Sequence, residues 1–165
     1  MELKYRIITL EDIEQVKQLG LISYGQFADL LGEHWNKMQA NISSNENWEK
    51  IIGGSTGFAC CDSEKIIGMA FIISSGNPWD IFKAEWSYIR MVGVDPAYGG
   101  KGIAKKLTNM CIDHAKKKGE KIIALHTSEF MDAARHIYET AGFKVLHPIE
   151  PRFGKKYWLY ILELN

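Results

Sequence analysis

The residues best suited to chemistry form a glycine-rich run, Gly-Gly-Lys-Gly-Ile-Ala, at positions 99–104. It follows an apolar stretch and opens an amphipathic one, so we expect it to join a strand to a helix. The first amide groups of a helix have no partner within the helix, and the helix dipole favours anions there. Gly99, Gly100 and Gly102 let the backbone approach such an anion without a side chain in the way. The run therefore predicts a turn that binds a phosphate group.

The residues around these glycines favour the same interpretation. Ala104 keeps the first helical turn small, and Lys101, Lys105 and Lys106 place positive charge nearby. An ordinary tight turn is the alternative, because glycine turns between strands and helices are common.

Two better-known phosphate motifs are excluded by their spacing. A Walker A loop needs Gly-x-x-x-x-Gly-Lys-Ser/Thr, but Asp95 stands at the first glycine position and Gly102 follows the lysine. A dinucleotide fingerprint needs Gly-x-Gly-x-x-Gly, and Lys105 stands where its third glycine belongs. The run is therefore expected to serve a different phosphate ligand.

Residues 94–104, Val-Asp-Pro-Ala-Tyr-Gly-Gly-Lys-Gly-Ile-Ala, resemble the coenzyme A loop of the GNAT acetyltransferase superfamily. That family's pattern is Gln/Arg-x-x-Gly-x-Gly/Ala, and Gly102 and Ala104 fill its fourth and sixth places. Gly99 stands where the family usually has Gln or Arg. Binding here is therefore expected to depend on backbone amides and the nearby lysines.

A second segment, residues 131–143, is similar to the family's Asn-x-x-Ala-x-x-Leu-Tyr-x-x-x-Gly-Phe segment and follows the next expected strand. Ala134, Tyr138 and Gly142 match the pattern, whereas Met131 stands at the Asn position. The resemblance implies acetyl-CoA as the acyl-donor substrate and no metal. The residues that it implies for coenzyme binding are Val92, Val94, Gly99, Gly100, Lys101, Gly102, Ala104, Met131 and Tyr138.

The resemblance also implies how the acyl group is activated. In this family, backbone N–H groups of the strand before the loop polarise the thioester carbonyl, and by position Val92 supplies that group. Val94 would contact the pantetheine arm, and Gly93 between them would ease a local bulge. Tyr138 matches the tyrosine that often protonates the departing thiolate. Packing in the core is the alternative role for each of these side chains.

The general base is less closely defined. Some family members use a glutamate on the strand before the loop, at the position of Tyr88. Others use one on the next strand, at the position of His126, and a histidine titrates near neutral pH. Glu85 is a third candidate, and ordered water can also carry the proton. The predicted catalytic residues are therefore Tyr138, His126 and Glu85.

The acceptor is expected opposite the coenzyme, over the N-terminal helices and the loops near the central strands. Aromatic side chains there could wall a pocket for an amine, although core packing is the alternative for each. These residues are Tyr24, Phe27, Trp35, Trp79, Trp86 and Tyr88.

Length and composition bound the class of protein. The chain has 165 residues, 46% of them hydrophobic, which predicts one domain over residues 1–165. Twenty basic residues balance twenty acidic ones, so a general nucleic-acid binder is not expected. Cys60, Cys61 and Cys111 have neither disulfide-framework nor zinc spacing. Without an apolar leader or membrane-length stretch, we expect a cytoplasmic protein.

The elements that position these residues can be read from apolar periodicity and turn residues. Expected strands cover residues 5–8, 58–61, 66–74, 84–94, 121–125, 143–146 and 157–164. The first expected helix follows Thr9, which would be its N-cap. Further helices are expected over residues 26–42, 102–117 and 131–141, with a short one at 48–51. This order predicts an α/β fold of the α+β type. The resemblance implies a mixed, centrally splayed sheet of about seven strands flanked by about four helices.

The predicted function is acetyl transfer from acetyl-CoA to a primary amine of a small molecule or peptide, by a monomer or homodimer. One alternative is a coenzyme A-binding regulator without turnover. Others are a different acyl donor, an acceptor oxygen, or a general nucleotide-phosphate binder.

Overall fold

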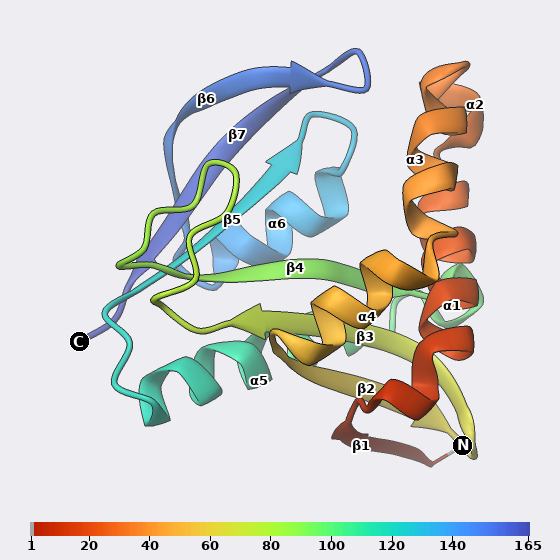
Figure 1. Cartoon of the computed structure of the whole chain (residues 1–165), viewed down its shortest axis with the longest axis horizontal. Helices are drawn as coiled ribbons and strands as arrows, with labels where there is room; N and C mark the ends of the chain where they lie inside the picture. Colours follow the sequence, from red (N-terminus) through yellow and green to blue (C-terminus); the bar gives the residue numbers. More distant parts are fainter. Residues whose placement is uncertain (1) are drawn as a thin grey trace.

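A seven-stranded sheet with helices on both faces forms the structure (Figure 1). The structure is a computed structural model that describes residues 2–165. The strands are β1 (Leu3–Ile7), β2 (Thr56–Asp62), β3 (Lys65–Ile73), β4 (Ser87–Val94), β5 (Ile122–Ser128), β6 (Lys144–Arg152) and β7 (Lys155–Glu163). The helices are α1 (Ile13–Gly25), α2 (Ala28–Leu31), α3 (His34–Ile42), α4 (Asn45–Gly53), α5 (Ile103–Lys117) and α6 (Asp132–Thr140), with 3-10 turns η1 (Leu10–Asp12) and η2 (Pro96–Tyr98).

The strands lie in the order β1-β2-β3-β4-β5-β7-β6, and β4 and β5 are the parallel pair among otherwise antiparallel neighbours. The predicted mixed, centrally splayed sheet of seven strands is confirmed. Parallel neighbours need a long crossover connection, which α5 provides between β4 and β5. The carboxyl end of β4 therefore leads directly into the N-terminus of α5.

The sheet is buried on both faces, and β3 shows why its sequence is continuously apolar. Ile67 packs in a core with α5 and α6, whereas Met69 and Phe71 pack in a second core with α1, α3 and α4. Successive strand residues face opposite sides of a sheet, so a strand covered twice needs apolar residues throughout. The two cores hold β3 and β4 rigidly between the helical layers.

Several predicted boundaries were wrong. The expected helix 26–42 is two helices, α2 and α3, interrupted at Gly32, and residues 2–165 form six α-helices in all. The strand expected from residue 84 begins at Ser87, because the Trp86 amide closes a turn on the Lys83 carbonyl at 3.1 Å. Strand β6 continues to Arg152, well past the expected end at residue 146. The prediction stopped too early because most side chains of β6 are exposed and show no apolar pattern.

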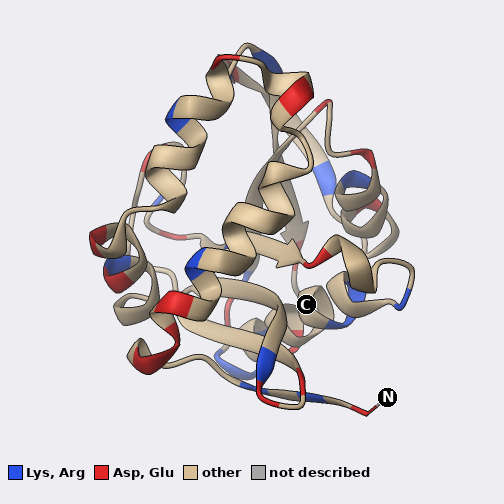
Figure 2. Ribbon diagram, turned by 90° about the vertical axis from the view of Figure 1, so that its right-hand side faces the viewer, with Lys and Arg blue, Asp and Glu red and all other residues tan. Residues whose placement is uncertain are grey.

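Charged residues of both signs are spread over the ribbon rather than gathered on one face (Figure 2). This distribution agrees with the balanced charge of the chain. Across residues 2–165, no helix combines the length and apolar character needed to cross a membrane.

Candidate active site

Strand β4 carries a bulge where the carbonyl-polarising group was expected. Gly93 pairs with Met69 and Arg90 pairs with Phe71, so two residues of β4, Met91 and Val92, face one residue of β3. Met91 has a φ of 53°, in the left-handed region that non-glycine residues seldom occupy. Such a bulge leaves an extra backbone group outside the ladder of hydrogen bonds. A backbone amide is therefore available at this point of β4.

The bulge at Met91 and Val92 directly precedes Gly93, the residue that was expected to ease a local bulge. Gly93 has a different constraint, since a Cβ there would lie 3.2 Å from the Ser23 hydroxyl oxygen and 3.3 Å from the Met69 methyl carbon. Its lack of a side chain lets α1 and β3 approach β4 closely.

Strands β4 and β5 separate just before this bulge. Their parallel pairing is confined to Ser87 with Ile123 and Tyr88 with Ala124. On its other edge β5 pairs with β7 along its whole length, so beyond Ala124 only the edge of β5 that faces β4 is unpaired. The two central strands thus open like a V, with the bulge of β4 on one arm and His126 on the other.

Helix α1 contributes two polar side chains to the β4 arm. The Tyr24 hydroxyl donates to the Val92 carbonyl oxygen at 3.2 Å, and the Val94 amide donates to the Ser23 hydroxyl at 3.3 Å. The side chains of Val92 and Val94 pack against the α5 core. Val92 and Val94 therefore contact α1 through backbone polar atoms, and their partly buried side chains pack against the core under α5.

The predicted phosphate loop lies directly after β4. The Asp95 carboxylate accepts from the Ala97 amide at 2.9 Å and the Gly99 amide donates to the Pro96 carbonyl at 3.1 Å, which shapes the turn η2. Gly100 and Gly102 then have φ of 77° and 75°. A Cβ on either would meet nothing within 4 Å, so open space lies over both glycines.

This open space faces the start of α5. The first hydrogen bond of the helix runs from the Lys106 amide to the Gly102 carbonyl at 3.0 Å. The amides of residues 103–105 precede it and have no acceptor within the helix. No side chain caps the helix from Gly102. These features fit the pyrophosphate of coenzyme A, which needs an unobstructed turn and unpaired amides.

The loop lysines do not act as one group. Lys101 and Lys105 are exposed at the turn. The Lys106 ammonium instead lies 4.5 Å from the centre of the Tyr5 ring, over β1. Two of the three predicted lysines thus remain available to a phosphate, and Ala104 keeps the first turn of α5 small.

Tyr138 lies on α6 beside the opening. Its ring is buried and packs edge-to-face on Phe143 with centroids 6.0 Å apart. Burial raises the pKa of Tyr138, and the nearby Tyr24 raises it further. Its hydroxyl has no hydrogen-bond partner within residues 2–165. Every fully buried side-chain oxygen in these residues does have a partner, so the Tyr138 hydroxyl is not fully buried. The hydroxyl therefore reaches an accessible opening and stays protonated.

Met131 occupies the position before α6 and accepts a hydrogen bond at its thioether sulfur from the Thr127 hydroxyl at 3.5 Å. It lies at the end of β5 and can contact a ligand there only through a soft, weakly polar atom.

His126 lies on the acceptor side of β5, stacked on Phe82 at 5.8 Å and edge-on to Tyr157 at 5.7 Å. Its Nε2 atom lies 3.2 Å from an Arg152 guanidinium nitrogen, which can only donate. Burial, followed by the charge of Arg152, lowers the pKa of His126 to about 4. At neutral pH the imidazole is uncharged and its Nε2 lone pair is occupied.

Glu85 is not brought into this group. It is exposed in the turn before β4, not in the strand where it was expected. Five strand residues separate Ser87 from Val92, which corresponds to about 17 Å. Glu85 therefore lies at the opposite end of β4 from the bulge.

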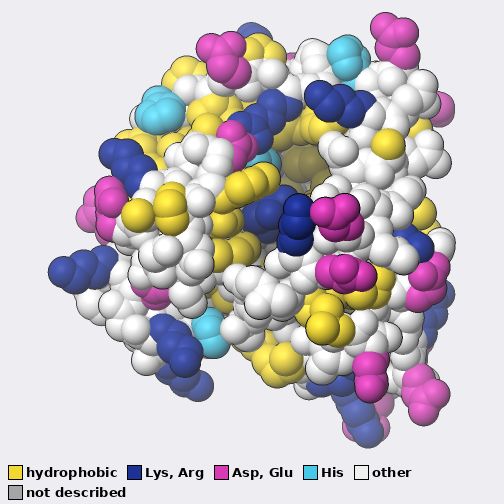
Figure 3. All heavy atoms as spheres, viewed as in Figure 1, with side chains coloured by type: hydrophobic (Ala, Val, Ile, Leu, Met, Phe, Trp, Pro, Cys, Tyr) yellow, Lys and Arg dark blue, Asp and Glu magenta, His cyan; other side chains and the backbone are white. Residues whose placement is uncertain are grey.

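The predicted aromatic residues pack with two of the cores. Tyr24, Phe27 and Trp35 pack against the core under α1, α3 and α4, and Phe27 meets Phe130 edge-on at 5.0 Å. Trp86 and Tyr88 lie in a smaller cluster with Phe82, and Trp79 stacks on Tyr88 at 6.4 Å. Figure 3 shows a hollow on the acceptor side, between the β6–β7 hairpin and helices α2 and α3, with hydrophobic, cationic and histidine side chains in its wall.

Sequence reasoning missed the charged residues of this acceptor cleft. Arg90 lies over the Trp79 ring, with its guanidinium carbon 3.8 Å from the ring centre. Arg152 forms an ion pair with Asp80 at 2.7 Å. One signal was present, since Arg90 is a charged residue inside a predicted apolar strand directly before the phosphate loop.

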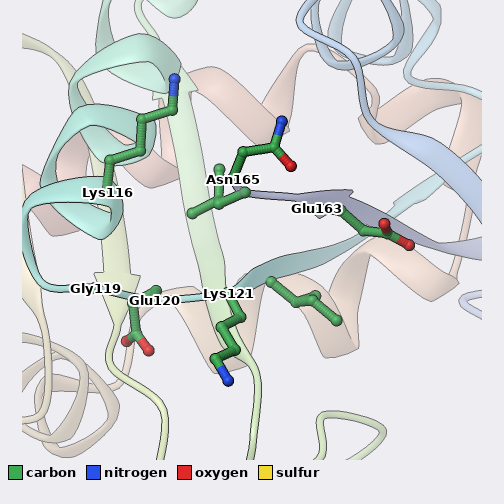
Figure 4. Close-up of a pocket in the computed structure, with 8 residues that line it drawn as sticks. Lys116, Gly119, Glu120, Lys121, Glu163 and Asn165 are labelled. Atoms are coloured by element: carbon green, nitrogen blue, oxygen red, sulfur yellow. The ribbon is translucent and has the colours of Figure 1, made fainter.

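A separate hollow of about 500 Å³ lies at the other end of α5, where the close-up in Figure 4 shows side chains from the turn after α5 and the end of β7. The 15 residues of α5 span about 22 Å between that hollow and the phosphate loop. It is therefore not part of the candidate active site. Among residues 2–165 no group of three or more His, Cys, Asp or Glu side chains could hold a metal ion.

Comparisons with known proteins agree with this geometry. Residues 25–143 match the acetyltransferase (GNAT) family. An uncharacterized N-acetyltransferase, MJ1207, of Methanocaldococcus jannaschii is 30% identical over 95 residues, which cover 58% of this chain and 37% of that protein. The chain spans between 37% and 55% of the length of the first curated relatives that it matches.

Two solved structures share the fold. The PaiA N-acetyltransferase of Thermoplasma acidophilum in complex with coenzyme A has a TM-score of 0.79 at 17% identity, covering 99% of this chain and all of that one. The YncA putative acetyltransferase of Salmonella typhimurium with acetyl-CoA has a TM-score of 0.72 at 20% identity, covering 99% and 94%. Both neighbours thus carry coenzyme A or its acetyl thioester.

Proposed function

The chain belongs to the acetyltransferase (GNAT) family, and we propose that it transfers the acetyl group of acetyl-CoA directly to a primary amine. The observation that carries this proposal is the open turn at Gly100 and Gly102, which follows the end of β4 shortly after the bulge at Met91 and Val92. A phosphate anchor and a carbonyl-polarising amide are therefore joined by a short, rigid stretch of backbone. Acetyl-CoA would supply the activated acyl group.

Backbone groups would bind the donor. The amides at the start of α5, with Lys101 and Lys105, would hold the pyrophosphate. The amide of Val92 would polarise the thioester carbonyl, and Val94 would contact the pantetheine arm. Met131 would border the coenzyme at the end of β5.

Tyr138 would act on the leaving sulfur. As the amine nitrogen bonds to the carbonyl carbon, the carbon–sulfur bond breaks and negative charge forms on sulfur. The raised pKa of Tyr138 keeps its proton in place, so the hydroxyl stabilises the thiolate chiefly as a hydrogen-bond donor.

The amine proton would pass to water rather than to a side chain of the protein. Arg152 occupies the Nε2 atom of His126, whose pKa of about 4 makes it a weak proton acceptor at neutral pH. Glu85 is exposed at the far end of β4. The aromatic walls of the acceptor cleft would exclude bulk water while leaving room for an ordered chain.

Thermal unfolding with acetyl-CoA, coenzyme A and ATP tests donor binding. Millimolar acetyl-CoA should raise Tm by several degrees, whereas ATP should have a much smaller effect. No shift with either coenzyme would reject the proposal. An equal shift with ATP would identify a general nucleotide-phosphate binder.

Release of coenzyme A thiol over a broad panel of amines tests turnover. The second candidate function is coenzyme A binding without turnover, which the replacements at Gly99 and Met131 favour. Thermal stabilisation by acetyl-CoA with no thiol release from any amine would support that candidate. Parallel assays with propionyl- and succinyl-CoA would determine the donor preference.

A further inference from the structure

Arg90 differs from every other arginine of the chain. Arg6 pairs with Asp12 at 2.8 Å, Arg135 with Asp132 at 3.8 Å and Arg152 with Asp80 at 2.7 Å. Within residues 2–165, Arg90 has neither an ion pair nor a side-chain hydrogen bond, and its contact is the face of Trp79. It is nevertheless half-buried. A guanidinium that is partly removed from water without a counter-ion is costly unless something else binds it.

Arg90 points into the acceptor cleft. The last pair between the central strands joins Tyr88 and Ala124, so Arg90 and His126 lie two residues farther along each arm, on the same face. Burial raises the pKa of Tyr24 and lowers that of His126, and the charge of Arg90 is a smaller influence on both groups. It therefore lies between the residues that wall the cleft.

The cleft as a whole has one positive charge without a partner. Asp80 neutralises Arg152, and His126 is uncharged at neutral pH. Asp80 also acts on Arg90 without forming an ion pair with it, so these four residues keep one net positive charge. A cationic acceptor such as a polyamine is disfavoured here, whereas a carboxylate would be attracted and could accept two parallel hydrogen bonds from the guanidinium.

The position of Arg90 suits an anionic group on the acceptor itself. Arg90 immediately precedes the bulge residues Met91 and Val92 in β4. Two strand residues span about 7 Å, so the backbone of Arg90 lies within a small molecule's length of the Val92 amide.

The rim of the cleft also favours a small molecule over a long peptide. At the tip of the β6–β7 hairpin, a Cβ on Gly154 would lie 2.7 Å from the His34 Nε2 atom. Phe153 beside it packs with the helical core. The hairpin tip therefore rests on α3, and the hollow in Figure 3 is bounded on that side.

From these contacts we infer that the acceptor is a small amine that carries a carboxylate, and that Arg90 binds this carboxylate. The inference rests on the proposed function and specifies its substrate class. The apolar part of the acceptor would lie against Tyr24, Phe27, Phe130 and Tyr157.

Matched pairs of amino acids and their amides test the inference. The pairs are glycine, leucine and phenylalanine with glycinamide, leucinamide and phenylalaninamide, compared at equal concentrations of unprotonated amine. In the wild type, kcat/KM should be at least about tenfold higher for the acid of the preferred pair. Arg90→Gln should remove this preference, by lowering kcat/KM for the acid about 10- to 100-fold. Arg90→Lys, which keeps the charge but not the planar fork, should fall between them.

Lys83→Gln is the matched control. It removes an exposed cation from the same loop that carries Trp79, where the Lys83 ammonium lies 5.3 Å from the centre of the Trp86 ring. The preference for acids should persist in this variant. Loss of the preference in Lys83→Gln as well would assign it to the overall charge of the face and overturn the role of Arg90.

Binding provides a readout that does not depend on turnover. Calorimetry in the presence of coenzyme A should show that the wild type binds N-acetylphenylalanine more tightly than its amide. Arg90→Gln should bind the acid and the amide with equal affinity. Equal binding of acid and amide to the wild type would overturn the inference. Acetylation of amides as efficiently as acids would also overturn it and leave the proposed function intact, whereas absence of acetyl-CoA binding would reject that function instead.

Discussion

The donor and acceptor sides of the candidate site are built from different materials. On the donor side, backbone groups of the bulge, of the glycine turn and of the first turn of α5 face the opening. On the acceptor side, side chains from α1, β4, β5, β6, β7 and the loop before β4 converge on one cleft. A site built from backbone groups is kept as long as the residues that shape the turn are kept. A site built from side chains can be changed by a single substitution. The donor side therefore depends mainly on the backbone, and the acceptor side depends on individual side chains.

The largest effect is expected where the backbone itself binds. Gly102→Val would place a branched side chain in the open space over the turn, and valine is strained at a φ of 75°. Loss of two or more hydrogen bonds to phosphate should weaken acetyl-CoA binding on the order of 1000-fold. The measurement is the dissociation constant for acetyl-CoA, by calorimetry.

Gly119→Val is the control for backbone strain. Gly119 has a φ of 76° and equally open surroundings, but it follows the opposite end of α5. Both variants should lose similar stability, and only Gly102→Val should lose affinity. Unchanged affinity in Gly102→Val would mean that the turn does not contact the coenzyme.

The second prediction concerns the acceptor side and the pH dependence of stability that His126 produces. The unfolded-state pKa of a histidine is about 6.5 and that of folded His126 is about 4, so the unfolded chain takes up this proton first as pH falls. The contribution of His126 to stability is therefore complete above pH 6.5 and is lost between pH 6.5 and 4. Its size is on the order of 3 kcal/mol.

Urea unfolding across this pH range would measure the effect. His126→Asn should flatten the profile, while His136→Asn, at an exposed position of α6, should leave it steep. Burial also lowers the pKa of His114, which contributes equally to both variants. If kcat of His126→Asn falls more than about 100-fold, the imidazole is a base after all and the proposed proton path through water is wrong.

The fold could be predicted where burial imposes a pattern. Residues 66–73 are apolar throughout because β3 is covered on both faces, and the glycine turn marked the junction of β4 and α5. The long hairpin of β6 could not be predicted, because its exposed side chains and two prolines hide the alternation of a strand. The interruption at Gly32 was missed because apolar residues continue on both sides of it.

The donor side of the site could be predicted for a related reason. Backbone binding needs particular residue types in sequence, such as Gly100 and Gly102, and these form a local motif. The acceptor side depends on contacts between distant segments, such as Arg152 with Asp80. His126 was placed in the cleft, but its pairing with Arg152 follows from the register of β5 and β7 and from the length of the hairpin.

A smaller effect is expected at Tyr138, which joins the two sides. Tyr138→Phe should lower kcat about tenfold and change acetyl-CoA affinity less, because the hydroxyl acts on charge that forms only during the reaction. With its pKa raised by burial, kcat should show no loss from tyrosine ionisation up to about pH 10. Tyr160→Phe, whose hydroxyl donates to Glu139 at 2.7 Å, should keep its kcat.

The smallest effect contrasts a structural arginine with one that we assign to the substrate. Arg6 donates to both carboxylate oxygens of Asp12 at 2.8 and 2.9 Å, and that carboxylate also accepts from the Thr9 amide. Arg6→Gln should therefore lower the free energy of unfolding by about 1 kcal/mol, the discounted value for a partly exposed pair. Within residues 2–165, Arg90 has no ion-pair or hydrogen-bond partner and contacts only the Trp79 ring, so Arg90→Gln should cost less than Arg6→Gln. Denaturant unfolding of the free protein would compare the two. A loss in Arg90→Gln as large as that in Arg6→Gln would make Arg90 a structural residue, because a side chain kept for a substrate contributes to the folded state only when that substrate is bound.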